Sequence, residues 1–229
     1  MEEAPETPRN TVHGSVWNLD SRFPNEIAKP SRGLFTPVPV VVSGVVPGSE
    51  SVGLGSTEQV SPAGIKVKES DFYEPFAEWL KNDLDEVTEV KALGGAGLKS
   101  KWGTPDVVGI YKPLASNLIK FSIEIVSAEI KIDPQAPVVA FGQAVAYRLF
   151  STKTYIAMPT TLTEEDQSRL ESLCMLFGVG LVLFDLNKEA PQFSIRVRAQ
   201  RFSPDMFYVN EFADRLKHYD TDIFEDLFG

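Results

Sequence analysis

The chain has little cysteine and histidine, and it has no long apolar run. Cys174 is the one cysteine among 229 residues, which excludes an internal disulfide framework and a cysteine-based zinc site. With only two histidines, His13 and His218, zinc chemistry is not expected. No apolar stretch approaches the roughly 20 residues that span a bilayer, and the acidic, polar start "MEEAPETPRN" is unlike a secretory signal. We therefore expect a cytoplasmic protein without a membrane partner.

Basic residues are outnumbered by acidic ones. The formal net charge is −10, with 22 Lys and Arg against 32 Asp and Glu. Because Lys and Arg dominate phosphate binding, this balance argues against a simple nucleic-acid coat protein. The charge is uneven, however: residues 89–153 contain eight bases and five acids, whereas residues 203–229 contain two bases and seven acids. A nucleic-acid site in the mildly basic middle of the chain is compatible with this distribution.

What the chain does have is a globular composition interrupted by one linker. Hydrophobic residues make up 43% of the chain and charged residues 24%. Residues 37–65 contain fourteen Gly, Pro or Ser among 29 and lack a helical period, which is typical of a linker, with room for one short strand at residues 40–42. The predicted organisation is an arm over residues 1–36, this linker, and a body over residues 66–229.

The arm has a pattern of its own. Val12 and Val16 are spaced as on one face of a helix, and "EIAKPSRGLFTPV" indicates a hairpin that turns at residues 31–33. Helix, polar turn and "RGLF" resemble the second half of a HARE-type winged helix-turn-helix, over about residues 7–36. The resemblance implies a DNA-binding arm with Arg32 of the wing as a contact. The helices that normally precede this half are absent, so the arm packs elsewhere, follows a longer natural start, or is irregular.

The body alternates helical and strand patterns. Apolar residues recur at helical spacing from Phe72 to Leu84, and Ser70 is the expected N-cap. Thr163 and the acids after it are favourable at a helix start. The order αβββαβαβ predicts a mixed α/β sandwich with a central mixed sheet flanked by helices. The further elements are strands over residues 87–95, 104–112, 119–131, 154–159, 180–186 and 193–202 (the last at an edge), and helices over 136–150, 163–178 and 206–218.

Two of these strands carry acids where a buried strand should be apolar. Asp106 lies in "TPDVVGI", and Glu129 and Lys131 lie two residues apart in "SAEIK", so they project from one strand face. Buried carboxylates stay charged only when they are paired or bind metal. Two carboxylates and a main-chain carbonyl form an all-oxygen site that suits Mg²⁺ or Mn²⁺, while Lys131 can hold a water or offset charge on a phosphate. A divalent ion would activate water and stabilise the phosphate in phosphodiester cleavage.

These motifs resemble a known signature. "TPD" followed by "AEIK" is similar to the PD-(D/E)XK signature of the restriction-endonuclease-like nuclease superfamily, whose core has the same αβββαβ order. The resemblance covers about residues 68–185. It implies that Asp106 and Glu129 are metal ligands as well as catalytic residues, and that Lys131 is catalytic.

Two further matches extend the resemblance. Glu74 stands where many members carry a helix-borne Glu that completes the metal site, and the Ile130 carbonyl would be the main-chain ligand. "QAVAY" resembles the Q-x-x-x-Y motif on the helix after the lysine strand, which places Gln143 and Tyr147 one turn apart in the catalytic site. In the Gly-rich loop before the "TPD" strand, Lys99 is one of two lysines expected to reach a phosphate backbone; the other is Lys101.

Each of these residues also has a structural alternative. Asp106 could cap the turn at Pro105, and Glu129 and Lys131 could form an ion pair on a solvated strand face. Gln143 and Tyr147 could be a capping amide and a core aromatic, and the two loop lysines could be solvated. The acids that could substitute in the metal site are Glu89 and Glu124.

The expected function is that of a Mg²⁺-dependent endonuclease of DNA in restriction or phage defence, as a homodimer or as a subunit of a larger defence complex. One alternative is a nuclease of the same fold that acts on RNA or is activated by a nucleotide or a partner. Another is a non-catalytic DNA-binding or assembly protein on this scaffold. Loss of Asp106 or Lys131 would have indicated the non-catalytic alternative, and both residues are present.

Overall fold

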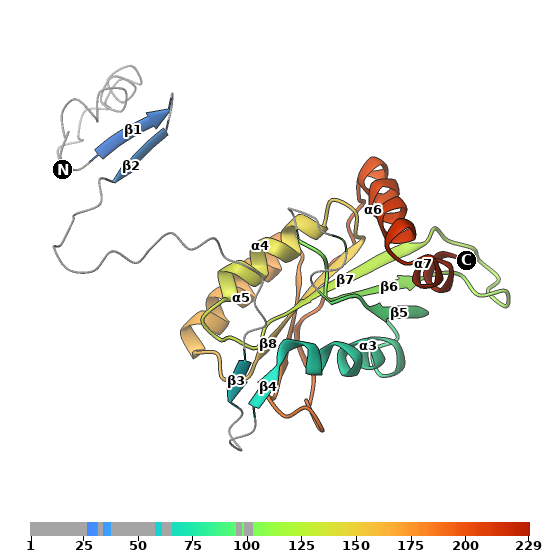
Figure 1. The fold of residues 1–229 in the computed structure, drawn as a ribbon, viewed down its shortest axis with the longest axis horizontal. Helices are drawn as coiled ribbons and strands as arrows, with labels where there is room; N and C mark the ends of the chain where they lie inside the picture. The colour runs from blue at the N-terminus through green and yellow to red at the C-terminus, as the bar shows by residue number, and fades with distance from the viewer. Residues whose placement is uncertain (1–26, 32–33, 38–57, 61–65, 95–97, 99–102) are drawn as a thin grey trace, which may run out of the picture. The chain divides into compact units, whose positions relative to one another are not determined.

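The computed structural model describes residues 27–31, 34–37, 58–60, 66–94, 98 and 103–229. The chain divides into two units, Met1–Ser51 and Val52–Gly229 (Figure 1). In the first unit, β1 (Ile27–Ser31) and β2 (Leu34–Pro37) pair antiparallel, which confirms the two strands of the predicted hairpin. The predicted helix before them, the turn residue Arg32 and the strand at residues 40–42 lie outside the described residues.

A six-stranded mixed sheet with open edges forms the centre of the second unit. Its strand order is β10-β9-β8-β7-β6-β5. The pairs β5–β6, β6–β7 and β9–β10 are antiparallel, while β7–β8 and β8–β9 are parallel. The strands are β5 (Glu89–Ala92), β6 (Val107–Tyr111), β7 (Glu124–Ile130), β8 (Lys153–Pro159), β9 (Gly180–Phe184) and β10 (Ser194–Val197).

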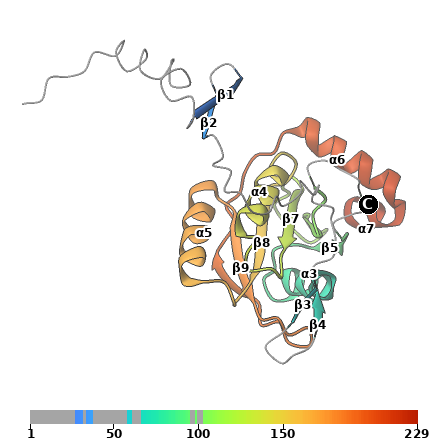
Figure 2. The same ribbon diagram turned by 60° about the vertical axis from the view of Figure 1, so that its left-hand side comes forward.

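Helices cover both faces of this sheet, because successive strand residues point to opposite sides (Figures 1 and 2). On one face the short 3-10 helix η1 (Glu69–Phe72) and α3 (Tyr73–Asn82) pack Phe72 and Phe76 against Val107. On the other face, α4 and α5 cover β8 and β9, and α6 and α7 pack on Val108 and Ile110 of β6. These four helices are α4 (Pro137–Tyr147), α5 (Glu164–Phe177), α6 (Met206–Tyr219) and α7 (Thr221–Phe228).

Burial explains why the strand predictions were largely right. Every residue of β7 and β9 is buried, as is typical of central strands, and β9 is a continuous apolar run. In β10 exposed and half-buried residues alternate, which confirms the expected edge strand. The strand that carries Glu129 begins at Glu124, later than the predicted residue 119, because residues 114–120 are exposed to solvent.

Local chemistry sets the helix ends. The Thr163 hydroxyl accepts from the Asp166 amide at 3.1 Å, which confirms it as the N-cap of α5. Ser70, the expected N-cap of the first body helix, is not a cap: it lies inside η1, and Phe72 occupies the N-cap of α3 without a side-chain hydrogen bond. Cys174 lies on the buried face of α5 and is part of the hydrophobic core.

Three elements lie where the sequence did not indicate them. A three-residue strand within the predicted linker, β3 (Glu58–Val60), pairs antiparallel with β4 (Lys66–Lys68). The acidic C-terminal residues form α7, which buries Leu227 and lies along the edge of the sheet.

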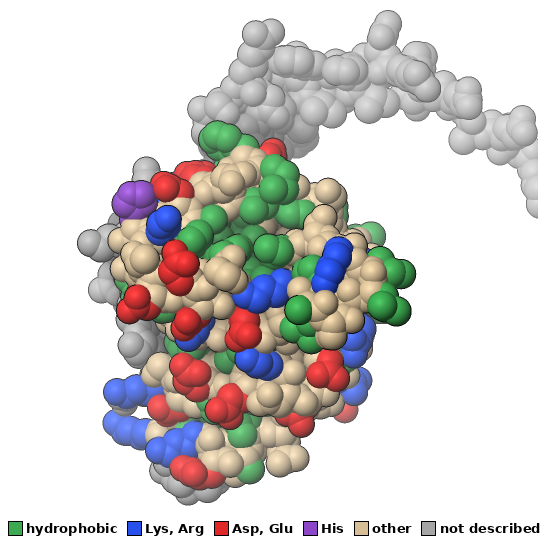
Figure 3. Space-filling view, turned by 90° about the vertical axis from the view of Figure 1, so that its right-hand side faces the viewer, with side chains coloured by type: hydrophobic (Ala, Val, Ile, Leu, Met, Phe, Trp, Pro, Cys, Tyr) green, Lys and Arg blue, Asp and Glu red, His purple; other side chains and the backbone are tan. Residues whose placement is uncertain are grey.

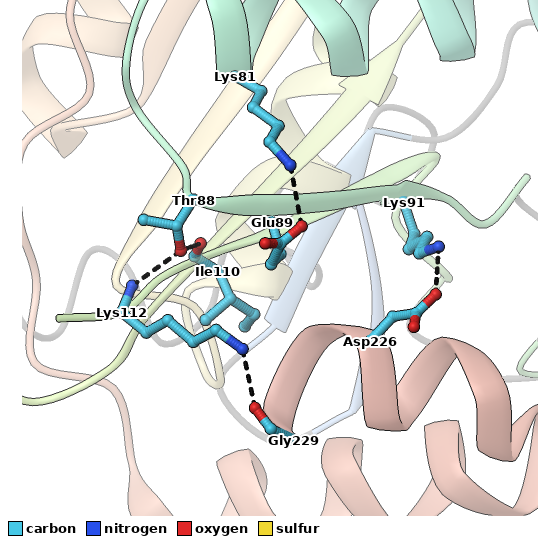
Figure 4. Close-up of polar contacts among 8 residues, drawn as sticks. All are labelled: Lys81, Thr88, Glu89, Lys91, Ile110, Lys112, Asp226 and Gly229. Carbon is cyan, nitrogen blue, oxygen red and sulfur yellow. Dashed lines mark hydrogen bonds and ion pairs between the residues drawn. The ribbon is translucent and has the colours of Figure 1, made fainter. Parts of the chain in front are cut away.

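One ion pair and one hydrogen bond connect the C-terminal helix to that edge. Lys91 of β5 is 2.6 Å from Asp226, and the Lys112 ammonium donates to the Gly229 carbonyl at 2.9 Å (Figure 4). Figure 3 views the same end of the molecule, where acidic and basic side chains are interspersed around a central group of hydrophobic ones. In the part of the chain that the structure describes, no helix has the length and apolar character needed to cross a membrane.

Candidate active site

The ends of β6 and β7 bring together the acids that the sequence singled out. Val107 of β6 lies opposite Ala128 of β7, so Asp106 and Glu129 are the next pair in this antiparallel register. The Asp106 amide donates to the Ala128 carbonyl at 3.0 Å, and the Ile130 amide donates to Asp106 Oδ2 at 2.8 Å. Two adjacent strands therefore fix both carboxylates at one edge of the core.

Both carboxyl groups are removed from solvent. Asp106 and Glu129 are each 2% exposed. Burial, and then the neighbouring charge of Glu129, raise the pKa of Asp106 to about 8, despite the opposing effect of Lys131. Burial likewise raises the pKa of Glu129. The charged form of both carboxyl groups is thus disfavoured, and a nearby positive charge would stabilise it.

Lys131 supplies part of that positive charge. Its ammonium nitrogen lies 2.7 Å from Glu129 Oε1 and 3.1 Å from Glu69 Oε1. Burial by itself lowers the pKa of Lys131, but the three surrounding carboxylates, Glu129, Glu69 and Asp106, outweigh it and hold the pKa above its ordinary value. The lysine is therefore charged and shared between two acids. The predicted ion pair between Glu129 and Lys131 exists, but it is buried and not on a solvated face.

Tyr147 and Gln143 reach the same cluster from α4. The Tyr147 hydroxyl donates to Glu129 Oε2 at 2.6 Å, and Gln143, one turn earlier, hydrogen bonds to that hydroxyl. The Gln143 Oε1 atom is buried without a partner among the described residues. Gly103 closes against them with φ +87°, and a Cβ there would lie 2.9 Å from the Tyr147 hydroxyl oxygen. Gly103 is a site residue that sequence reasoning missed.

Glu69 and Tyr73 were missed as well. The Tyr73 hydroxyl hydrogen bonds to Asp106, and Glu69 pairs with Lys131. The two residues are four apart, across the junction of η1 and α3. The four-residue spacing of Glu69 and Tyr73, which places two residues on one face of a helix, could have indicated them in the sequence.

Glu74, the predicted helix-borne ligand, is not among the side chains that meet at this cluster. Its side chain is exposed on the first turn of α3, and its charge acts on Lys91 of the edge strand. The acid that α3 and η1 bring to the lysine is Glu69. The two acids are five residues apart and lie in different helical segments, Glu69 in η1 and Glu74 in α3, so their side chains have different neighbours.

The two acids considered as substitutes have other partners. Glu89 pairs with Lys81 at 2.9 Å on the outer strand (Figure 4). Glu124 begins β7, five residues before Glu129 and so about 17 Å away along the strand, where it pairs with Arg201. Neither acid joins the cluster.

The three predicted nucleic-acid contacts, Lys99, Lys101 and Arg32, lie outside the described residues.

Within the described residues there is no group of three or more Asp, Glu, His or Cys side chains arranged as metal ligands. The expected donor set needs only two, Asp106 and Glu129, with a main-chain carbonyl. Their raised pKa values and all-oxygen chemistry fit a divalent cation of the Mg²⁺ or Mn²⁺ type.

Comparison of the chain with protein-family models, with curated proteins and with solved structures gave no significant match.

Chemically, the cluster offers two buried carboxylates as oxygen ligands, a charged amine beside them and a tyrosine hydrogen-bonded to each acid. Such a set can hold a cation, orient a water and balance negative charge on a substrate.

Proposed function

We propose that this chain is a Mg²⁺- or Mn²⁺-dependent nuclease that hydrolyses phosphodiester bonds of DNA. It would be an endonuclease of restriction or phage defence, acting in the cytoplasm as a homodimer or within a larger defence complex. The observation that carries the proposal is the buried pair of Asp106 and Glu129 on adjacent strands with Lys131 beside it. The order α3-β5-β6-β7-α4-β8 supports it, because it agrees with the αβββαβ core of the PD-(D/E)XK nucleases that the motifs resemble.

The metal would be held by Asp106, Glu129 and the Ile130 carbonyl. When bound, the ion supplies Lewis-acid stabilisation of the phosphate and a more acidic water. Asp106 is preset for this task, because the Ile130 amide and the Tyr73 hydroxyl fix its orientation. Tyr147 does the same for Glu129. Residues held in this way need little reorganisation when the substrate arrives.

Lys131 would position the attacking water and offset negative charge on the phosphate. Glu69 keeps it charged and within reach of the acids. Gln143 is placed to orient a water or the scissile strand, since its Oε1 atom is a buried acceptor without a donor among the described residues. Lys131 contacts Glu129 directly, whereas Glu69 acts through Lys131 and Gln143 is next to the Tyr147 hydroxyl.

One assay tests the function. Supercoiled plasmid, linear duplex, single-stranded DNA and RNA are incubated with Mg²⁺, Mn²⁺ or EDTA, using the wild-type protein and Asp106→Ala. We expect nicking or cleavage of DNA that needs the metal and is lost in Asp106→Ala. Cleavage of RNA alone would replace the DNA proposal with an RNA nuclease. DNA binding without cleavage under any metal condition would favour the non-catalytic alternative.

A further inference from the structure

A cavity of about 280 Å³ lies between α4, α6 and the segment that leads into β6. Its walls are Gly103 and Pro105 on one side, Tyr147 and Phe150 on a second, and Tyr208 and Arg215 of α6 on a third. The residues of α6 lie beyond residue 185, the end of the stretch that resembles the nuclease superfamily. The cavity therefore combines the candidate site with a part of the chain that the motifs did not cover.

Tyr147 joins the cavity to the acids. Its side chain lines the cavity, while its hydroxyl donates to Glu129 Oε2 at 2.6 Å. Gly103 contributes to the same wall, and only a residue without a Cβ leaves the Tyr147 hydroxyl in place there. A ligand in the cavity would thus be one side chain away from Glu129.

The aromatic side chains in the walls suit a flat aromatic ligand. The Phe150 ring is stacked on Phe212 with centroids 4.3 Å apart and an interplanar angle of 7°, which fixes one wall. Tyr208 is 38% exposed, so its ring is available to a ligand from solvent. Aromatic walls of this kind bind nucleobases by stacking, without preference for one base.

The charged side chains of the lining both come from α6. Arg215 and Glu211 form an i,i+4 ion pair, and their side chains are 47% and 39% exposed. An exposed pair of this kind is weak, so each partner can exchange the other for a ligand. The guanidinium offers donors and the carboxylate offers acceptors, which suits the edge of a base.

The volume of the cavity limits the size of the ligand that it can hold. A water occupies roughly 30 Å³ of liquid and drug-sized ligands take roughly 300–1,000 Å³. At about 280 Å³ the cavity has room for a single base. A base in a duplex is paired and stacked, so it enters such a site only if it is single-stranded or flipped out.

We propose that this cavity binds one unpaired nucleobase of the strand whose phosphate lies at Asp106 and Glu129. The inference rests on the proposed nuclease function and deepens it. It names the substrate class as single-stranded DNA, or DNA with unpaired nucleotides at the cut.

The test is a binding measurement that does not need catalysis. A 15-nucleotide oligothymidine with one central 2-aminopurine is titrated with full-length protein in Ca²⁺, and stacking is followed by quenching of the 2-aminopurine fluorescence. We expect saturable quenching with the single strand and a weaker response with the complementary duplex. Tyr208→Ala should weaken binding by roughly fivefold or more and remove the quenching, whereas Tyr208→Phe should restore both. Tyr219→Ala removes an exposed tyrosine elsewhere on α6 and should match wild type.

The outcomes separate this inference from the nuclease proposal. Equal quenching by Tyr208→Ala and Tyr219→Ala, in a protein that cleaves DNA, would overturn the base site and leave the nuclease proposal standing. Free 2-aminopurine riboside that binds as tightly as the oligonucleotide would also overturn it, because the cavity would then be a site for a free nucleoside. Quenching that depends on Tyr208, in a protein that cleaves nothing with any metal, would support the base site and refute the nuclease.

Discussion

Replacing Asp106 with asparagine should stabilise the metal-free protein and abolish its response to metal. Burial and the charge of Glu129 raise the pKa of Asp106 from its ordinary 3.8 to about 8. Between these values the folded state binds the proton and the unfolded state does not, so stability falls as pH rises from about 4 to about 8. At about 1.4 kcal/mol for each pKa unit, the loss has an upper limit of about 6 kcal/mol.

The asparagine would keep the shape of the side chain and an acceptor for the Ile130 amide, but it does not titrate. The Asp106→Asn protein should therefore lack this dependence on pH. Even one third of the limit, about 2 kcal/mol, corresponds to a rise in melting temperature of roughly 4–8 °C for a domain of this size. The assay is thermal unfolding in EDTA from pH 5 to pH 9, followed by circular dichroism.

Adding Mg²⁺ or Mn²⁺ should raise the stability of the wild type relative to that of Asp106→Asn. A cation at one hundred times its dissociation constant stabilises the wild type by about 2.7 kcal/mol, and it should leave Asp106→Asn unchanged. Glu74→Gln removes an exposed carboxylate outside the cluster and is the matched control, expected to behave like wild type in both conditions. Equal stabilisation of wild type and Asp106→Asn by metal would refute the site. Loss of the metal response in Glu74→Gln would return that residue to the ligand set.

Three other changes have expected outcomes. Lys131→Ala should lower the cleavage rate constant on the order of 10²-fold, with little change in DNA affinity measured in Ca²⁺, and a fully active variant would reduce the lysine to an ion-pair partner. Gly103→Ala should destabilise the fold by about 1 kcal/mol or more in denaturant titration, because of its φ of +87°, whereas Gly142→Ala, with nothing within 4 Å of the added Cβ, should not. Burial raises the pKa of Cys174 to about 12, so a thiol reagent at pH 8 should modify it only after denaturation; rapid labelling of the native protein would contradict its burial.

The centre of the fold could be predicted because its signals are local and redundant. Continuous apolar residues indicated β9, and the apolar residues beside Asp106 and Glu129 indicated β6 and β7, in which these acids stand out. Strand pairing then placed the acids together, as the two-residue period of a strand requires. For these residues, pattern and tertiary structure agree.

The surroundings of the site could not be predicted in the same way. Glu69 and Tyr73 reach the acids only because η1 precedes α3 and turns their side chains inward, a detail that apolar spacing does not encode. Glu74, one residue after Tyr73, points outward for the same reason. The cavity depends on α6, which is distant in sequence from Tyr147 and is brought beside it by packing on the sheet.

A cation that binds Glu129 would have to displace one of the donors that hold its carboxylate. Both oxygens of Glu129 have donors in this structure: Lys131 holds Oε1 and Tyr147 holds Oε2. Lys131 has a second partner in Glu69 at 3.1 Å, so it can leave Oε1 and remain paired. The lysine would then stay charged beside the freed oxygen, where a phosphate needs its charge balanced. Glu69 would thus keep the lysine paired when a cation took the place of its contact with Glu129.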